Sequence, residues 1–290
     1  MTPIRKILFP IDFSERCTSA AAHVKLWAEH LSASIVSLHV VDPKNYFAKD
    51  DRSEDTFWEH LPSYIDKRTR DLDYFCTRYL DGPQVSKVVL GGDTALQIVA
   101  LAESEKVELV MLPRDHQSLG SRWLHDSLTA QVLNDCPAAV WTSEHVSSLP
   151  VRPLKHVLCA IHVADDLSLD AAMERMLQFL RAICTGFGAS ATCLFVGNSE
   201  ETHLGKMMRR SGGSLAIAER LSQIRHDIFD IADFETGSGR VADAIHEAAV
   251  RTNSDLIVLG RTRPFTAGLG LQQHILSVDH RAGCPVVSIF

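Results

Sequence analysis

Residues 6–12 read Lys-Ile-Leu-Phe-Pro-Ile-Asp, and 150 residues further along the chain residues 156–162 read His-Val-Leu-Cys-Ala-Ile-His. Each run is short and apolar, and each is followed by a turn and then by apolar side chains at helical spacing. The first helical pattern runs from about Ser14, a typical N-cap residue, to Leu31, and the second spans Ala171–Ile183. An apolar run before a helix is typical of a strand buried on both faces of a parallel sheet.

Four more segments repeat in the same order, which indicates an internal duplication. They are Ala33–Val41 and Ala189–Val196, Gly92–Ile98 and Gly239–Ile245, Glu108–Leu112 and Asp255–Leu259, and Cys136–Trp141 and Cys284–Ile289. A length of 290 residues suits two domains of about 145 residues. We therefore expect domains at residues 1–145 and 154–290, joined by a linker within Ser143–Pro153, where prolines and serines break the periodicity.

Strands that alternate with helices predict an α/β fold. We expect each half to be a doubly wound, five-stranded, mostly parallel sheet with helices on both faces and functional loops at the carboxyl ends of the strands. One stretch, Lys44–Tyr64, is charged and aromatic. The favoured interpretation is a loop and a helix that pack their aromatic side chains on the domain's own core, and the alternative is a lid or a partner surface.

Composition excludes several classes of protein. A net charge of -7 argues against a broad nucleic-acid face. The absence of about 18 uninterrupted apolar residues argues against a membrane span, and Arg5, Lys6 and Asp12 come too early for a signal peptide. The seven scattered cysteines without a Cys-x-x-Cys pair predict reduced thiols in a cytoplasmic protein. The fourteen histidines form no zinc-binding pattern, so no metal is expected.

As an ensemble, these motifs resemble the universal stress protein family: the first apolar run with Asp12, the Ser-Leu-His-Val-Val run at residues 37–41, Gly-Asp-Thr-Ala at residues 92–95, and the terminal Cys-Pro strands. The resemblance covers nearly the whole chain. It implies strand order 3-2-1-4-5 and an adenine-nucleotide α-hydrolase-like fold. It also implies pairing of domains through their last strands, here Ala138–Thr142 with Val286–Phe290 within one chain, or self-association between chains.

In that family the ATP binders carry Gly-x2-Gly-x9-Gly-(Ser/Thr) after the fourth strand and an aspartate that ends the first strand and faces the adenosine. Glycines allow backbone N–H groups to approach phosphate oxygens. The first half keeps Asp12 and Ser127, but Pro113, His116 and Asp126 stand where the three glycines are expected. A proline removes an N–H donor, and an aspartate adds a negative charge where a phosphate would lie.

The second half departs from the pattern in a different way. His162 replaces the aspartate, Gly260 matches the first glycine, Arg263 stands at the second, and Gln273-His274 replaces the final pair. The resemblance therefore predicts degenerate ATP motifs in both halves. The candidate ligand-binding residues are Asp12, Val41, Arg114, His116 and Ser127 in the first half and Gly260, Arg261, Arg263 and His274 in the second.

The cationic and titratable residues of the second-half loop suggest two interpretations. Arg261, Arg263 and His274 would attract an anion by charge instead of through backbone N–H groups. The alternative is that the arginines are ordinary solvated residues of a surface loop.

Three other segments carry chemically active residue types. Thr236–Arg240 is not a Walker motif, and we interpret it as a turn that caps the following helix. We interpret His39 as a hydrogen-bonded core histidine. Cys17 lies where a helix dipole lowers a thiol pKa, yet inert packing is the favoured interpretation. No Ser/His/Asp nucleophile elbow is present, so no catalytic residue is predicted.

Two functions follow from the sequence. The first is a non-enzymatic stress-response protein, a pseudo-dimer that binds a small molecule or a protein partner and needs no cofactor. The alternative is an ATP-binding protein with slow hydrolysis, in which the loop cations replace the glycines. The degenerate glycine loops favour the first function.

Overall fold

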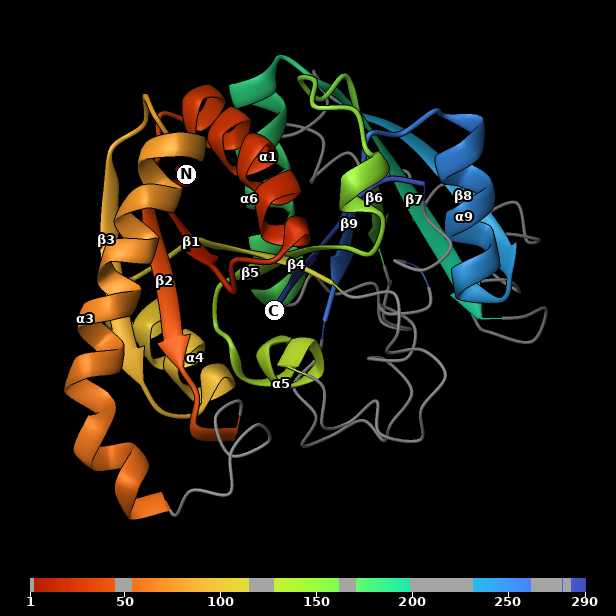
Figure 1. The fold of residues 1–290 in the computed structure, drawn as a ribbon. Coiled ribbons are helices and arrows are strands. Elements are labelled where there is room, and N and C mark those ends of the chain that lie inside the picture. The colour runs from red at the N-terminus through yellow and green to blue at the C-terminus, as the bar shows by residue number, and fades with distance from the viewer. Residues whose placement is uncertain are drawn as a thin grey trace, which may run out of the picture. The chain divides into compact units, whose positions relative to one another are not determined.

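The computed structural model of the chain describes residues 3–44, 54–114, 128–161, 171–198, 232–261, 278 and 283–290. These residues divide into two compact units between Arg152 and Pro153. Each unit is an open α/β sheet flanked by helices (Figure 1).

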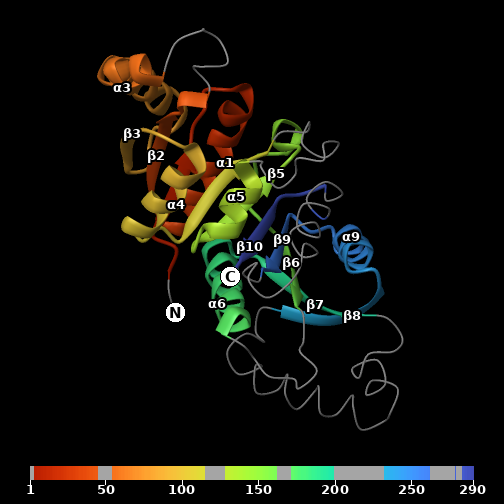
Figure 2. The same ribbon diagram turned by 90° about the horizontal axis from the view of Figure 1, so that it is seen from below.

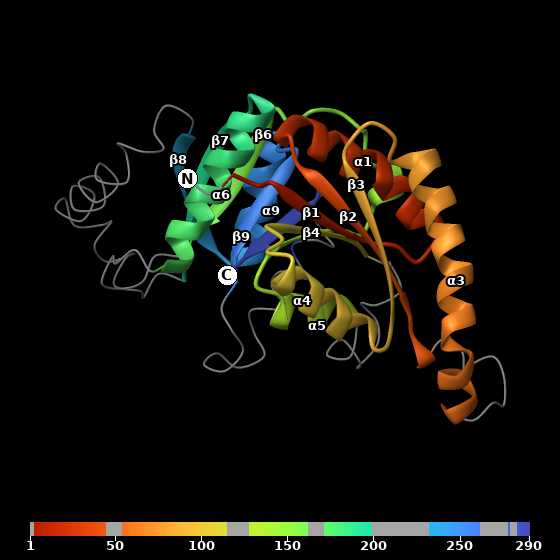
Figure 3. The same cartoon turned by 90° about the vertical axis from the view of Figure 1, so that its left-hand side faces the viewer.

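The sheet of the first unit contains β1 (Lys6–Pro10), β2 (Ser34–Val41), β3 (Val85–Gly91), β4 (Leu109–Pro113) and β5 (Ala139–Ser143). The strands follow the order β3-β2-β1-β4-β5, and every paired neighbour is parallel. Helices α1 (Glu15–Leu31) and α3 (Glu54–Tyr79) lie on one face, and α4 (Thr94–Ser104) and α5 (Leu128–Asp135) lie on the other (Figure 3). A short 3-10 helix, η3 (Val146–Ser148), packs against α1.

The local signals in the sequence explain where the helices of the first unit begin. Ser14 is the N-cap of α1, and its hydroxyl oxygen accepts a hydrogen bond from the Cys17 N–H at 3.3 Å. Asp93 caps α4 in the same way and accepts from the N–H groups of Ala95 and Leu96. The apolar stripe of α1, which includes Val24 and Trp27, is buried, so the predicted first helix is confirmed.

The second unit repeats this architecture with β6 (His156–Ile161), β7 (Ser190–Asn198), β8 (Ala232–Gly239), β9 (Leu256–Gly260) and β10 (Val286–Ile289). Their order, β8-β7-β6-β9-β10, is again 3-2-1-4-5, and the paired strands are parallel. Helices α6 (Ala171–Phe187) and α9 (Val241–Arg251) cover opposite faces of this sheet (Figure 2). The predicted fold class and strand order are confirmed.

One sequence-based interpretation needs correction in the second unit. Thr236–Gly239 is the last part of strand β8 and pairs with β7, so it does not form a turn. Arg240 then occupies the N-cap position of α9, where its side chain makes no capping hydrogen bond. The glycines and small polar residues suggested a turn, but pairing with a central strand holds them extended.

The two units also share a hydrogen-bonding arrangement. Glu108 precedes β4, and its carboxylate accepts the N–H groups of Arg5 and Lys6 at 3.2 and 2.9 Å. Asp255 precedes β9, and its carboxylate accepts the N–H groups of Lys155 and His156 at 2.8 and 3.2 Å. In each unit, therefore, the carboxylate of the residue before the fourth strand holds the start of the first strand by hydrogen bonds to its backbone.

Among the helices that the structure describes, none is both long enough and apolar enough to be a membrane span.

Candidate functional site

The carboxyl ends of β1 and β4 mark the point where the winding of the first unit reverses. The two strands are parallel neighbours, yet the chain leaves β1 toward α1 on one face and reaches α5, which follows β4 in the chain, on the other (Figure 3). Ligands of open α/β sheets bind in the crevice at such a switch point. Asp12, which follows β1, and Arg114, which follows β4, are therefore the first residues to consider.

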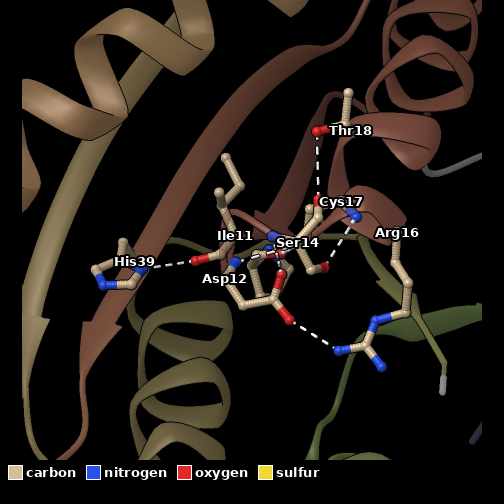
Figure 4. Close-up of polar contacts among 8 residues, drawn as sticks. Ile11, Asp12, Ser14, Arg16, Cys17, Thr18 and His39 are labelled. Carbon is tan, nitrogen blue, oxygen red and sulfur yellow. Dashed lines mark hydrogen bonds and ion pairs between the residues drawn. The ribbon is translucent and has the colours of Figure 1, made fainter.

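Asp12 presents its carboxylate at this edge (Figure 4). Its Oδ1 accepts the N–H of Ser14 at 2.9 Å, and its Oδ2 accepts a hydrogen bond from Nη2 of Arg16, also at 2.9 Å. Partial burial acts to raise the pKa of Asp12, but hydrogen bonds from Cys17, Ser14 and Arg16 outweigh it and lower the pKa to about 2. The side chain remains 51% exposed, so a ligand can reach a charged acceptor here.

Cys17 supports the backbone beneath Asp12. The N–H of Asp12 donates to Sγ at 3.5 Å, and the thiol donates to the carbonyl of Pro10 at 3.7 Å. Burial and the charge of Asp12 raise the pKa of the Cys17 thiol to about 12, so the thiolate that a nucleophile requires is absent at neutral pH. The side chain is buried, which confirms the prediction that Cys17 is a packing residue.

His39 also has a structural role. Its Nδ1–H donates to the carbonyl of Ile11 at 2.7 Å (Figure 4). Its ring lies 4.6 Å from that of Phe13, centroid to centroid. Burial lowers the pKa of His39 more than this hydrogen bond raises it, so the ring is neutral at neutral pH. The prediction of a hydrogen-bonded core histidine is confirmed.

The ends of β2 and β3 are held together by backbone and carboxylate contacts. Val41 is buried, and its carbonyl accepts the N–H of Gly92 at 3.1 Å. The buried Asp42 carboxylate accepts from the Lys44 N–H at 2.9 Å and from the N–H and hydroxyl of Thr94 at 3.0 and 2.8 Å. Sequence reasoning missed Asp42, although an aspartate directly after an apolar strand was a readable signal.

Arg114 is buried after β4, where its Nη2 lies 3.3 Å from Oε2 of Glu144. The two side chains are 2% and 0% exposed. Arg261 holds the corresponding place after β9 and is buried as well, with its guanidinium carbon 3.9 Å from the ring centroid of Phe290. Both arginines thus direct their guanidinium groups into contacts within their own units.

Gly260, which ends β9, is exposed. Among the residues that the structure describes, a Cβ atom added there would meet only Sδ of Met176, at an ordinary contact distance of 3.7 Å. The described residues thus leave the backbone at this position open to the close approach of another molecule.

The structure brings Asp12, Val41 and Arg114 to one edge of the first sheet and places Gly260 and Arg261 at the matching edge of the second. His116, Ser127, Arg263 and His274 lie outside the described residues, as do His162 and Asp126. Within the described part of the chain, no group of three or more His, Cys, Asp or Glu side chains could hold a metal ion.

Residues 3–143 match the Universal stress protein family. Over this segment, about half of the chain, the sequence is similar to that family. Over 142 residues it is 24% identical to the universal stress protein MJ0577 of Methanocaldococcus jannaschii, an overlap of 44% of this chain and 88% of that protein.

Two solved structures share the fold over both units. A universal stress protein from Archaeoglobus fulgidus DSM 4304 aligns with a TM-score of 0.72 at 16% identity and covers 98% of this chain and 95% of its own. Protein PA1789 from Pseudomonas aeruginosa PAO1 aligns with a TM-score of 0.61 at 14% identity, over 99% of this chain and 92% of its own. At these identities the likeness concerns the universal stress protein fold alone.

Proposed function

We propose that the chain is a tandem universal stress protein that acts in a stress response by binding a small ligand or a partner, without catalysis. Its two domains are residues 1–145 and 154–290. The observation that supports the proposal best is Asp12, an ionised and half-exposed carboxylate at the switch point of the first sheet.

The side chains around Asp12 favour binding over catalysis. Cys17 carries a raised pKa and His39 a lowered one because both are buried, and each is engaged with the backbone. A nucleophile with a base in hydrogen-bonding reach is the usual signature of covalent catalysis. Around Asp12 the described residues instead offer a carboxylate acceptor that Ser14 and Arg16 hold by hydrogen bonds.

Pro113 supports the view that the first-half ATP motif is degenerate. It ends β4 at the position of the first motif glycine, and it has no N–H to offer a phosphate oxygen. ATP binding with slow hydrolysis remains the alternative function. Self-association through the last strands and a cytoplasmic location remain predictions from the sequence, and analytical ultracentrifugation of the full chain tests the first of them.

Thermal unfolding of the full chain in the presence of a panel of nucleosides, nucleotides with magnesium, and sugars tests the proposal. A ligand at 100 times its Kd stabilises the folded state by about 2.7 kcal/mol, a readily measured shift. We expect at least one compound to stabilise the wild type but not Asp12→Asn. Failure of every compound at millimolar concentration would contradict small-ligand binding, and stabilisation by magnesium-ATP with release of phosphate would favour the alternative.

A further inference from the structure

We infer that His23 and Trp141 form an acid-sensitive contact between helix α1 and strand β5, and that this contact loosens when His23 takes up a proton. The inference is independent of the proposed function, because it concerns the core of the first unit and not the carboxyl edge of its sheet. It gives the first unit a stability that falls in mild acid.

Two aromatic side chains with unpartnered nitrogen atoms meet in this core. His23 lies on the buried face of α1 and is 6% exposed, and Trp141 lies on β5 and is fully buried. Their ring centroids are 6.2 Å apart. Nε2 of His23 and Nε1 of Trp141 are both buried, and neither has a hydrogen-bond partner within the described part of the chain. Buried polar atoms are usually hydrogen-bonded, so this pair is an exception that calls for an explanation.

The neutral form of His23 suits this place better than the cation. A neutral imidazole carries one N–H and one lone pair, whereas an imidazolium carries two N–H donors and a positive charge. The indole nitrogen of Trp141 is a donor only, so it cannot accept a hydrogen bond from the cation. Burial accordingly lowers the pKa of His23 below its ordinary value of 6.5.

The charged groups around α1 are matched among themselves. Helix α1 packs against β1, β4, α3 and η3. Strands β4 and β5 contain no titratable side chain. On the other elements the charged pairs are Lys6 of β1 with Glu105, Arg68 of α3 with Asp71, and Glu144, two residues before η3, with Arg114.

Helix α1 itself carries two more ion pairs, Arg16 with Asp12 and Lys25 with Asp81. His30 lies in its last turn, and His145 directly precedes η3. Burial, and not any of these groups, is the cause of the lowered pKa of His23. A proton on His23 is therefore left without a compensating charge.

The direction of the pH dependence follows from the lowered pKa. In the unfolded chain His23 takes up a proton near pH 6.5, and in the folded chain it does so only at a lower pH. The contribution of neutral His23 to stability is therefore complete above pH 6.5, and the free energy of unfolding decreases as the pH falls from 6.5 toward the lowered pKa. Mild acid thus weakens the contact between α1 and β5.

Urea unfolding of the full chain, followed by tryptophan fluorescence, tests the inference. The four tryptophans, Trp27, Trp58, Trp123 and Trp141, all precede the linker, so their fluorescence reports on the first unit. His23→Phe keeps an aromatic ring and removes the titrating nitrogen atoms. We expect the urea midpoint of the wild type to fall between about pH 7.5 and about pH 5, and His23→Phe to lose a large part of this fall. His39, whose pKa burial also lowers, accounts for the remainder.

His30→Gln is the matched control. His30 belongs to the same helix but lies in its last turn, where the macrodipole favours a cation. Protonation of His30 therefore does not destabilise the helix. His30→Gln should show an acid-induced fall in midpoint at least as large as that of the wild type.

A fall in midpoint that is as large in His23→Phe as in the wild type would overturn the inference, and so would a fall that His30→Gln removes. If His23→Phe does not fold, the imidazole and indole N–H chemical shifts of the isotope-labelled wild type decide the matter. His23 should then titrate below pH 6.5, and the indole N–H of Trp141 should shift with the same midpoint. Titration of His23 at or above pH 6.5, or an indole resonance of Trp141 that does not respond, would overturn the inference.

Discussion

The buried ion pair between Arg114 and Glu144 gives the sharpest test of how the first unit is held together. Glu144→Gln keeps the size and shape of the side chain and removes its charge. The Arg114 guanidinium, only 2% exposed, would then lose the carboxylate that lies 3.3 Å from it. The change should therefore destabilise the first unit strongly.

The size of the effect follows from burial. Removal of one partner from a buried pair costs about 3 to 5 kcal/mol, because the remaining buried charge loses the opposite charge beside it. The exposed pair between Lys6 and Glu105, whose side chains are 31% and 47% exposed, offers a matched control in the same unit. Glu105→Gln should cost about 0 to 1 kcal/mol.

Urea unfolding followed by far-ultraviolet circular dichroism measures both changes. With an m-value of about 2 kcal/mol per M, Glu144→Gln should lower the midpoint of the first unit's transition by about 2 M. Replacement of both partners, by Arg114→Met with Glu144→Leu, should recover most of this loss, because an apolar pair carries no desolvation cost. Equal midpoints for Glu144→Gln and Glu105→Gln would refute the assignment of a buried charge pair.

Three further predictions concern Asp12, the contact of α3 with β3, and the cysteines. Folding lowers the pKa of Asp12 to about 2 from an ordinary 3.8. The ionised side chain therefore stabilises the folded state above pH 4, and this stabilisation is lost as the pH falls through 2. The stability advantage of the wild type over Asp12→Asn, about 1 kcal/mol after solvent screening, should therefore disappear over that range in acid unfolding. A Cβ atom at Gly91 would lie 2.7 Å from Cδ2 of Leu61, so Gly91→Ala should lower stability by about 1 to 2 kcal/mol. Leu61→Ala should reduce the penalty of that substitution in a double-mutant cycle of urea midpoints. All seven cysteines are buried, and burial raises the pKa values of Cys17 and Cys184 to about 12. A thiol reagent at pH 8 should therefore label the chain only after denaturation. Fast labelling of Cys17 in the folded chain would contradict this prediction.

The strands and the helix α1 could be predicted because their signals are local. The apolar run before Asp12 and the cap at Ser14 lie within a few residues of the structure they specify. The order of the strands could be predicted for another reason, since the two halves repeat the same segments and resemble one family.

The contacts of the candidate site depend on the folded chain and were less predictable. Arg114 and Glu144 are 30 residues apart in sequence, and only the pairing of β4 with β5 brings them together. The carboxylate of Asp42, which follows β2, likewise reaches Thr94, which begins α4 after the neighbouring strand β3. Sequence reasoning identified Arg114 as a candidate ligand residue but could not show that a carboxylate of the same unit already pairs with it.

The measurement that tests the central claim most directly is a titration of the isotope-labelled full chain with adenosine, followed by amide and side-chain carboxyl chemical shifts. If the carboxyl edge of the first sheet is the binding site, the largest changes will fall on Asp12, Ser14 and Arg16, and they will be absent in Asp12→Asn. Saturating changes centred elsewhere in the chain, or identical changes in Asp12→Asn, would contradict the account.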